Sequence, residues 1–162
     1  MLTDGIISHY ALGGAVAATF YLEPAATLDV AVFVLLPNAD GTLVSLSPIY
    51  EYLKSPGGIE SREYITIGDW PVQFLVPANE LEREAVAAAV PVDVEGVRTW
   101  VMLAEHLVAI ALSVGRAKDY IRILQFINEK AVDRKTLLTV LETHGLTMKW
   151  KQFEHRFLEG GS

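Results

Sequence analysis

The chain has 162 residues, of which 51% are hydrophobic, and its formal net charge is −7 at pH 7. A chain of this length can bury about 70% of its unfolded surface in one or two small cores. The absence of cysteine excludes disulfides, thiolate catalysis and zinc–thiolate sites. A negative charge without a run of Lys or Arg argues against binding to duplex nucleic acid, but leaves room for a small anionic ligand.

The longest apolar stretches lie at 10–22 and 100–114 and are interrupted by Gly, Glu or His. Both fall short of the about 20 residues that a membrane span requires. The N-terminus also lacks a basic segment followed by an apolar run and a cleavage site. We therefore expect no membrane span and a cytoplasmic location.

The first predicted elements surround a pair of glycines. A short apolar segment at 9–12 leads through Gly13-Gly14 into an apolar stretch at 15–22, which is typical of a buried helix after a tight turn. Residues 30–36 are apolar and rich in β-branched side chains, which predicts a strand covered on both faces. Turn residues at 37–41 end that strand.

The next elements alternate between helix and strand. A short helix is predicted at 48–54, with Pro48 at its first position. The remaining elements of this part are strands at 62–67 and 71–76 across a turn at 68–69, a helix at 80–89, and a strand pair at 91–94 and 97–101.

From residue 103 onward, apolar residues recur at helical spacing and predict three helices, with a fourth at 147–157. Asp133 and Gly145 mark the start and the end of the third helix. The predicted fold class is α+β, with a small mixed β-sheet flanked by helices and then a C-terminal helical bundle. We place the sheet region at residues 1–101 and the helical region, packed on it or forming one compact unit with it, at 102–162.

Two short patterns suggest chemistry. A strand that ends at Gly13-Gly14 before a helix brings backbone N–H groups and a helix dipole to one point, which suits a phosphate. The alternative is a tight turn that needs positive φ angles.

Asp29 opens the next strand, where an Asp-x-Asp pair would present two carboxylates on one face for divalent metal ions, but the second position is Ala31. On its own, a single Asp there is also typical of a turn or cap.

Together, several segments resemble the nucleotidyltransferase superfamily related to DNA polymerase beta, in particular its bacterial abortive-infection toxin type and relatives. The segments that carry the resemblance follow one another over residues 8–125: Gly13-Gly14 before an Ala-rich stretch, Thr27-x-Asp29, the strand at 70–75, Glu105-His106-Leu107 and Arg116-Ala117-Lys118-Asp119. The resemblance implies that Gly13, Gly14, Thr27, Arg116 and Lys118 contact an NTP. It also implies that Asp29 is the catalytic, Mg²⁺-binding carboxylate.

The chain departs from the pattern of this family at its charged positions. The position at which the family has an arginine before the Thr-x-Asp motif is occupied by Ala25 in this chain. The positions of the second and third carboxylates are occupied by Ala31 and Gln73. A lysine of the helix after Glu-His-Leu appears as Ala111 or Leu112. Asp29 could support one weakly bound ion together with substrate phosphates. Two ions about 3.5 to 4 Å apart would repel each other with too little compensating charge.

Arg116, Lys118 and Asp119 stand where one helix ends at Gly115 and another begins. Arg116 and Lys118 could face a phosphate across a cleft between sheet and helices. Alternatively, Arg116 and Asp119, three residues apart, form a local ion pair at a helix N-terminus. We interpret Asp119 as a structural partner and not as a metal ligand.

Other polar residues give no site by their spacing. The spacing of the four histidines, His9, His106, His144 and His155, gathers no metal ligands with a carboxylate, and each is expected to be a surface or partly buried residue. Glu80, Glu82 and Glu84 alternate along a predicted helix and are expected to form its solvated face.

Two functions follow from these patterns. The first is a nucleotidyltransferase-like protein that has lost catalysis and serves as a nucleotide- or phosphate-binding module, or as an interaction module with a protein partner or a second copy of itself. The second is an active, metal-dependent transferase that moves NMP from an NTP to an unknown acceptor. The sequence alone leaves both open.

Overall fold

The fold was analysed in a computed structural model, which describes residues 5–22, 30–37, 47–54, 59–61, 64–67 and 70–159. Thr27 and Asp29 lie outside these residues, as do Ala25, the turn at 68–69 and all of the predicted turn at 37–41 except Pro37.

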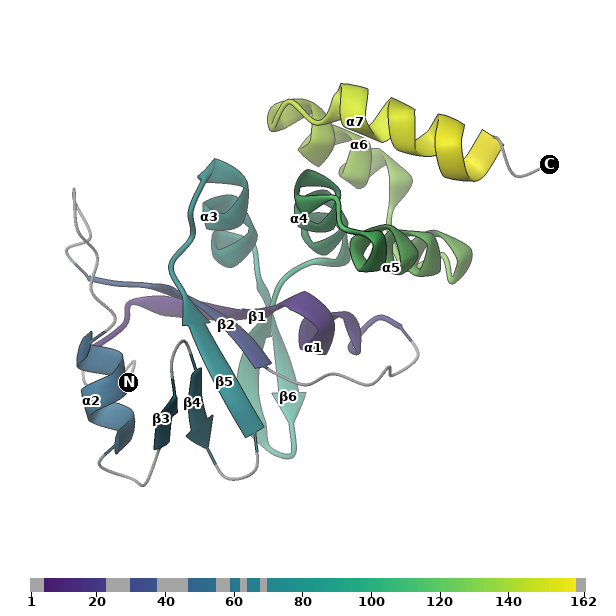
Figure 1. The fold of residues 1–162 in the computed structure, drawn as a ribbon. Coiled ribbons are helices and arrows are strands. Elements are labelled where there is room, and N and C mark those ends of the chain that lie inside the picture. The colour runs from purple at the N-terminus through teal and green to yellow at the C-terminus, as the bar shows by residue number, and fades with distance from the viewer. Residues whose placement is uncertain are drawn as a thin grey trace.

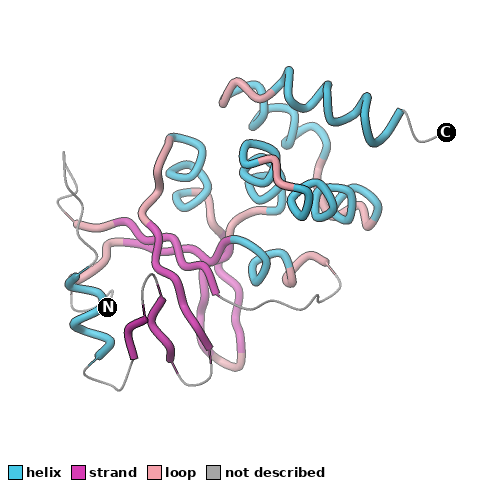
Figure 2. The backbone as a smooth tube through the Cα atoms, in the orientation of Figure 1, coloured by secondary structure: helices cyan, strands magenta, loops and turns pink. Residues whose placement is uncertain are grey.

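The described strands form one mixed sheet (Figures 1 and 2). Its strands are β1 (His9–Gly13), β2 (Val30–Leu35), β3 (Ile59–Ser61), β4 (Tyr64–Ile67), β5 (Trp70–Leu75), β6 (Val90–Val94) and β7 (Val97–Val101). They lie in the order β3-β4-β5-β2-β1-β7-β6. The pairs β2–β5 and β1–β7 are parallel, and the other neighbouring pairs are antiparallel. The predicted mixed sheet is thus confirmed.

The central strand β2 explains why the sheet has a core on both faces. Alternate residues of a strand point to opposite faces. Phe33 therefore packs into one apolar cluster with α1 (Gly14–Ala18), α3 (Glu80–Ala87) and the C-terminal helices. Val34 packs into a second cluster with Ile49 of α2 (Ser47–Lys54). The nearly uninterrupted apolar sequence of β2 follows from this double burial.

The C-terminal part is helical, as predicted. It contains α4 (Ala104–Val114), α5 (Ala117–Asn128), α6 (Arg134–Thr143) and α7 (Thr147–Phe153), which continues into the π-helical turn η1 (Glu154–Glu159). Asp133 caps α6, since its side chain accepts a hydrogen bond from the Thr136 N–H at 3.0 Å. Gly145 follows the C-cap of α6 with a φ of +68°, a conformation that suits glycine.

The sheet and the helices share the larger apolar cluster. Val108 and Ala109 of α4 are fully buried in it, together with Val101 at the end of β7 and Ile123 of α5. Helix α4 thus lies between the sheet and the other C-terminal helices (Figure 1). The boundary between residues 101 and 102 does not separate two cores.

Two helices end earlier than predicted, and one strand was not predicted. The helix predicted at 15–22 ends at Ala18, and turns follow to residue 22. The helix predicted at 80–89 ends at Ala87. Strand β3 was not predicted, because three residues are too few for an alternating pattern to be recognised. Among the described residues, no helix has the length and apolar character that crossing a membrane would need.

Candidate functional site

The two glycines between β1 and α1 are required for different reasons. A Cβ on Gly13 would lie 2.7 Å from Cε2 of Phe33, so close packing on β2 excludes a side chain there. Gly14 has a φ of +62°, which side-chain-bearing residues rarely adopt. The turn interpretation therefore accounts for Gly14, and packing accounts for Gly13, so contact with a phosphate stays a prediction.

Two neutral residues, at positions where the resemblance led us to look for carboxylates, are neighbours in the sheet. Ala31 of β2 is paired in register with Gln73 of β5, and Gly13 of β1 is paired with Ala31 on the other side. A Cβ on Gly14 would lie 3.5 Å from the Cβ of Ala31. The end of β1, Ala31 and Gln73 therefore form a continuous row across three strands.

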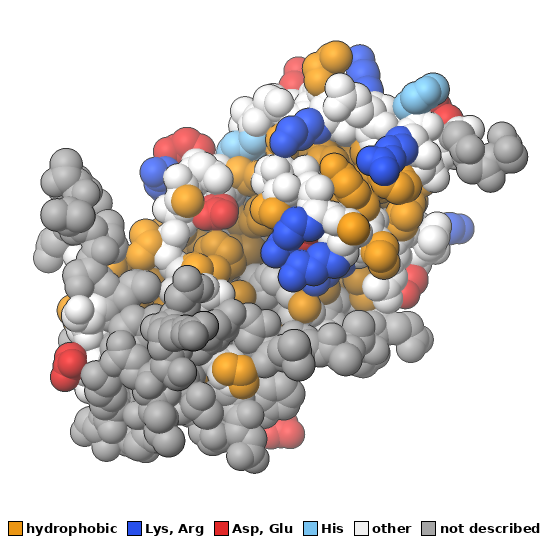
Figure 3. Space-filling model, in the orientation of Figure 1, with side chains coloured by type: hydrophobic (Ala, Val, Ile, Leu, Met, Phe, Trp, Pro, Cys, Tyr) orange, Lys and Arg blue, Asp and Glu red, His pale blue; other side chains and the backbone are white. Residues whose placement is uncertain are grey.

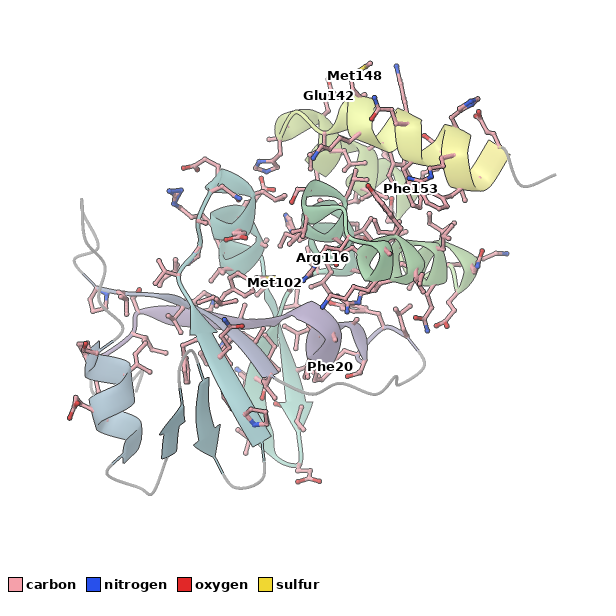
Figure 4. The ribbon with its side chains drawn as sticks, in the orientation of Figure 1. Phe20, Met102, Arg116, Glu142, Met148 and Phe153 are labelled. Carbon is pink, nitrogen blue, oxygen red and sulfur yellow. The ribbon has the colours of Figure 1, made fainter. Side chains whose placement is uncertain are left out.

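A pocket of about 330 Å³ lies above this row, between the sheet and helices α3, α4 and α5. Its polar and small lining residues are Gly14, Ala15, Ala31, Gln73, Glu82, Arg116, Lys118, Asp119 and Arg122. Its apolar lining residues are Phe33, Leu75, Met102, Leu107, Ile110, Ala111 and Val114. Figure 3 shows basic side chains beside an apolar hollow on this face. In Figure 4, Met102 lies close to the sheet and Arg116 lies above it at the start of α5.

An ion pair organises the basic side of the pocket. Asp119, 1% exposed, accepts hydrogen bonds from the Arg116 backbone N–H at 3.0 Å and from Nε of the Arg116 side chain at 2.7 Å. Burial opposes the charge of Asp119, but these hydrogen bonds outweigh burial and lower the pKa of its carboxyl group. Of the two alternatives, the local ion pair is present. It leaves Arg116 on the pocket lining.

Two further cations of the pocket have no such partner. Within the described part of the chain, Lys118 and Arg122 make no hydrogen bond and no ion pair. Glu82, on the α3 side of the pocket, accepts a hydrogen bond from the Ala78 N–H at 2.6 Å. With Asp119 neutralising Arg116, the lining keeps two positive side chains against one negative one, although the chain as a whole is strongly negative.

Most of the residues that the sequence singled out meet at this pocket. Gly14, Ala31, Gln73, Arg116 and Lys118 all line it, whereas Gly13 lies beside it in β1. Thr27 and Asp29 are not among the described residues, so their roles stay predictions.

Sequence reasoning missed two charged residues of the pocket lining, Arg122 and Glu82. Arg122 follows Lys118 by four residues on α5, a helical spacing that could have identified it. Glu82 was assigned to a solvated helix face. Its contact with the pocket depends on where α3 packs, which no local pattern reveals.

His106 is buried, contrary to the expectation for the histidines, and it shares the carboxylate of Glu84 with the partly buried His144. Glu84 Oε2 lies 2.9 Å from His106 Nε2 and 2.8 Å from His144 Nε2. Partial burial raises the pKa of the Glu84 carboxyl group, but the hydrogen bonds from His144 and His106 outweigh it, and the net effect lowers that pKa. The three residues are separated by 22 and 60 positions, so only the packing of α3 against α4 and α6 brings them together.

A metal centre has no complete ligand set in the part of the chain that is described. No group of three or more His, Cys, Asp or Glu side chains is arranged there to hold a metal ion. The expectation of a weak Mg²⁺ site therefore rests on Asp29, and Gln73 could add only a neutral amide oxygen. The sequence matches no protein-family model and no curated protein.

Proposed function

We propose that the pocket binds the phosphate groups of a nucleotide, and that the protein is a nucleotidyltransferase-like binding module without two-metal catalysis. The observation that carries this proposal is the pocket lining. It combines Lys118 and Arg122, which make no hydrogen bond or ion pair among the described residues, with the neutral pair Ala31 and Gln73.

The cations support an anionic ligand. Unpaired Lys and Arg side chains at a concave site bind phosphate through charge-assisted hydrogen bonds. A volume of about 330 Å³ is at the lower end of the range for small-molecule sites. The apolar side of the same pocket, with Met102 and Leu107, offers a surface for a base or a sugar.

The neutral pair argues against catalysis. Two-metal transfer needs carboxylates that compensate the repulsion between ions about 3.5 to 4 Å apart. Ala31 brings no ligand atom, and Gln73 brings no charge and cannot act as a general base. Binding of phosphate through cations needs neither metal-binding carboxylates nor a general base.

Calorimetric titration of the full chain with the four NTPs, with Mg²⁺ or Mn²⁺ and with a chelator, tests the proposal. We expect at least one NTP to bind in the presence of the chelator. Lys118→Gln and Arg122→Gln should each weaken that binding about tenfold, since each removes a charge-assisted hydrogen bond. Lys135→Gln, on the exposed part of α6 and outside the pocket lining, is the matched control and should leave the affinity unchanged.

Two results would contradict the proposal. The first is no binding of any NTP or of inorganic triphosphate. The second is binding that depends strictly on metal and disappears in Asp29→Ala, because it would favour the active transferase over the degenerate module.

A further inference from the structure

A second polar cluster lies at the junction of three helices, outside the pocket lining. It consists of Glu84 on α3, His106 on α4 and His144 at the C-cap of α6, and we refer to it as the Glu84 latch. One carboxylate oxygen, Oε2 of Glu84, lies within hydrogen-bond distance of both imidazoles, 2.9 Å from Nε2 of His106 and 2.8 Å from Nε2 of His144. The side chains of His106 and His144 are only 5% and 11% exposed, whereas that of Glu84 is 41% exposed.

The chemistry of the latch determines where the imidazole protons lie. An ionised carboxylate only accepts hydrogen bonds, and the lowered pKa of Glu84 favours its ionised form. Both imidazoles must therefore donate from Nε2. Nδ1 of His106 is buried and has no hydrogen-bond partner among the described atoms, so a proton has no acceptor there.

The latch is also the polar connection between α3 and the C-terminal helices. Within the described residues, the bonds to His106 and His144 are the only hydrogen bonds that join α3 to the chain after residue 103. Apolar packing supports the contact of α3 with α4, since Leu81 and Ala85 share a cluster with Leu107 and Val108. The hydrogen bond of His144 directly joins α6 to α3.

Two of the three helices that form the latch, α3 and α4, also line the pocket. Glu82, two residues before Glu84, lies on one side of the pocket, and Leu107, next to His106, lies on its apolar wall. Helix α6 contributes no lining residue. A change in how α6 is held at Glu84 can therefore reach the pocket through α3 and α4.

We propose that the Glu84 latch couples the docking of α6 to the position of the two pocket walls. When His144 is bound to Glu84, the carboxylate holds α3 and α4 together at a fixed separation. When the His144 bond is lost, Glu84 keeps only the His106 donor, and the contact of α3 with α4 then depends on that single bond and on apolar packing. This coupling does not depend on which ligand the pocket takes.

Two NMR measurements on the full chain test the latch. Long-range ¹H–¹⁵N correlations should show the Nε2–H tautomer for both His106 and His144. In His144→Phe, which keeps a ring but has no donor, the amides of α6 should exchange with solvent about tenfold faster, as expected for the loss of a hydrogen bond to a charged group. In the same variant, the methyl signals of Leu107 and Ile110 on the pocket wall should shift. Glu84→Gln should produce the same pattern.

Matched controls separate the latch from general effects of substitution. Glu80→Gln changes an exposed carboxylate of the same helix, and His155→Phe changes an exposed histidine of η1. Neither should alter α6 exchange or the pocket methyl signals. Faster α6 exchange without any shift of Leu107 and Ile110 would overturn the coupling, and an Nδ1–H tautomer at either histidine would overturn the latch. His144→Phe carries the test if Glu84→Gln does not fold.

Discussion

Asp119 illustrates how a single buried charge is stabilised at the residue scale. Its side chain is 2% exposed, and Arg116, which is 55% exposed, supplies a charge-assisted hydrogen bond to Oδ2 at 2.7 Å. The same oxygen accepts the backbone N–H of Arg116 at the start of α5. Asp119 therefore serves as a helix cap and as the anchor that keeps Arg116 on the pocket lining.

The variant Asp119→Asn should lower the free energy of unfolding by about 2 kcal/mol at neutral pH, because it removes the charged acceptor of a buried ion pair. The folded-state pKa of Asp119 is lowered, so its contribution is complete above the unfolded-state pKa and is lost as the pH falls through the folded-state value. The difference between wild type and variant, measured by urea unfolding, should therefore shrink on acidification. A difference that stays constant with pH would contradict this account.

Gly13 and Gly14 show that identical neighbours can have distinct roles. Gly13 leaves room for the Phe33 ring, and Gly14 adopts a positive φ. The sequence pattern predicted the second role. The first depends on the register of β1 against β2 and was not visible from the sequence.

At the scale of elements, the register between β2 and β5 decides what the pocket can hold. Because Ala31 and Gln73 are paired, their Cα atoms belong to neighbouring parallel strands about 4.8 Å apart. Two acidic side chains at these positions would stand side by side on the pocket floor. This arrangement suits one divalent ion and is repulsive without it.

The double variant Ala31→Asp/Gln73→Glu should therefore gain a metal site. We expect its free energy of unfolding to fall by about 1–2 kcal/mol without metal, because like charges oppose each other, and to recover with Mn²⁺. Urea unfolding with and without Mn²⁺ measures both effects. Ala31→Asn is the control without added charge. If Mn²⁺ stabilises the double variant no more than wild type, the pocket floor is not arranged as described.

At the scale of the whole molecule, one apolar cluster unites the sheet with α4, α5, α6 and α7. Ala11 of β1 and Ala85 of α3 are fully buried, and they belong to the same cluster as Ile123 and Leu137 of the helical part. The two regions that the sequence distinguishes by composition thus depend on each other for burial. Helix α4, with Val108 and Ala109 fully buried, is central to that dependence.

A fragment of residues 1–101 should consequently fail to fold on its own. Without α4, the apolar face of the sheet that packs on the helices would be exposed, and burial is the dominant stabilising contribution. We expect no cooperative urea transition for the fragment by near-ultraviolet circular dichroism, and a single transition for the full chain. A sigmoidal transition of the fragment would show that residues 1–101 form an independent domain.

Local patterns determined most elements of this protein. The apolar run of β2, the turn signals around β6 and β7, and the helical spacing of α4 to α7 each report the burial of one segment, which periodicity records directly. The sequence motifs and the resemblance built on them also singled out five residues that all line one pocket: Gly14, Ala31, Gln73, Arg116 and Lys118.

Only the tertiary structure decided which residues meet across those elements. The register of β2 with β5 placed Ala31 beside Gln73, and the packing of α3 against α4 and α6 brought Glu84 to two histidines. The physical reason is that such contacts depend on the relative position of whole helices and strands. That position results from burying a shared core, and no short stretch of sequence records it.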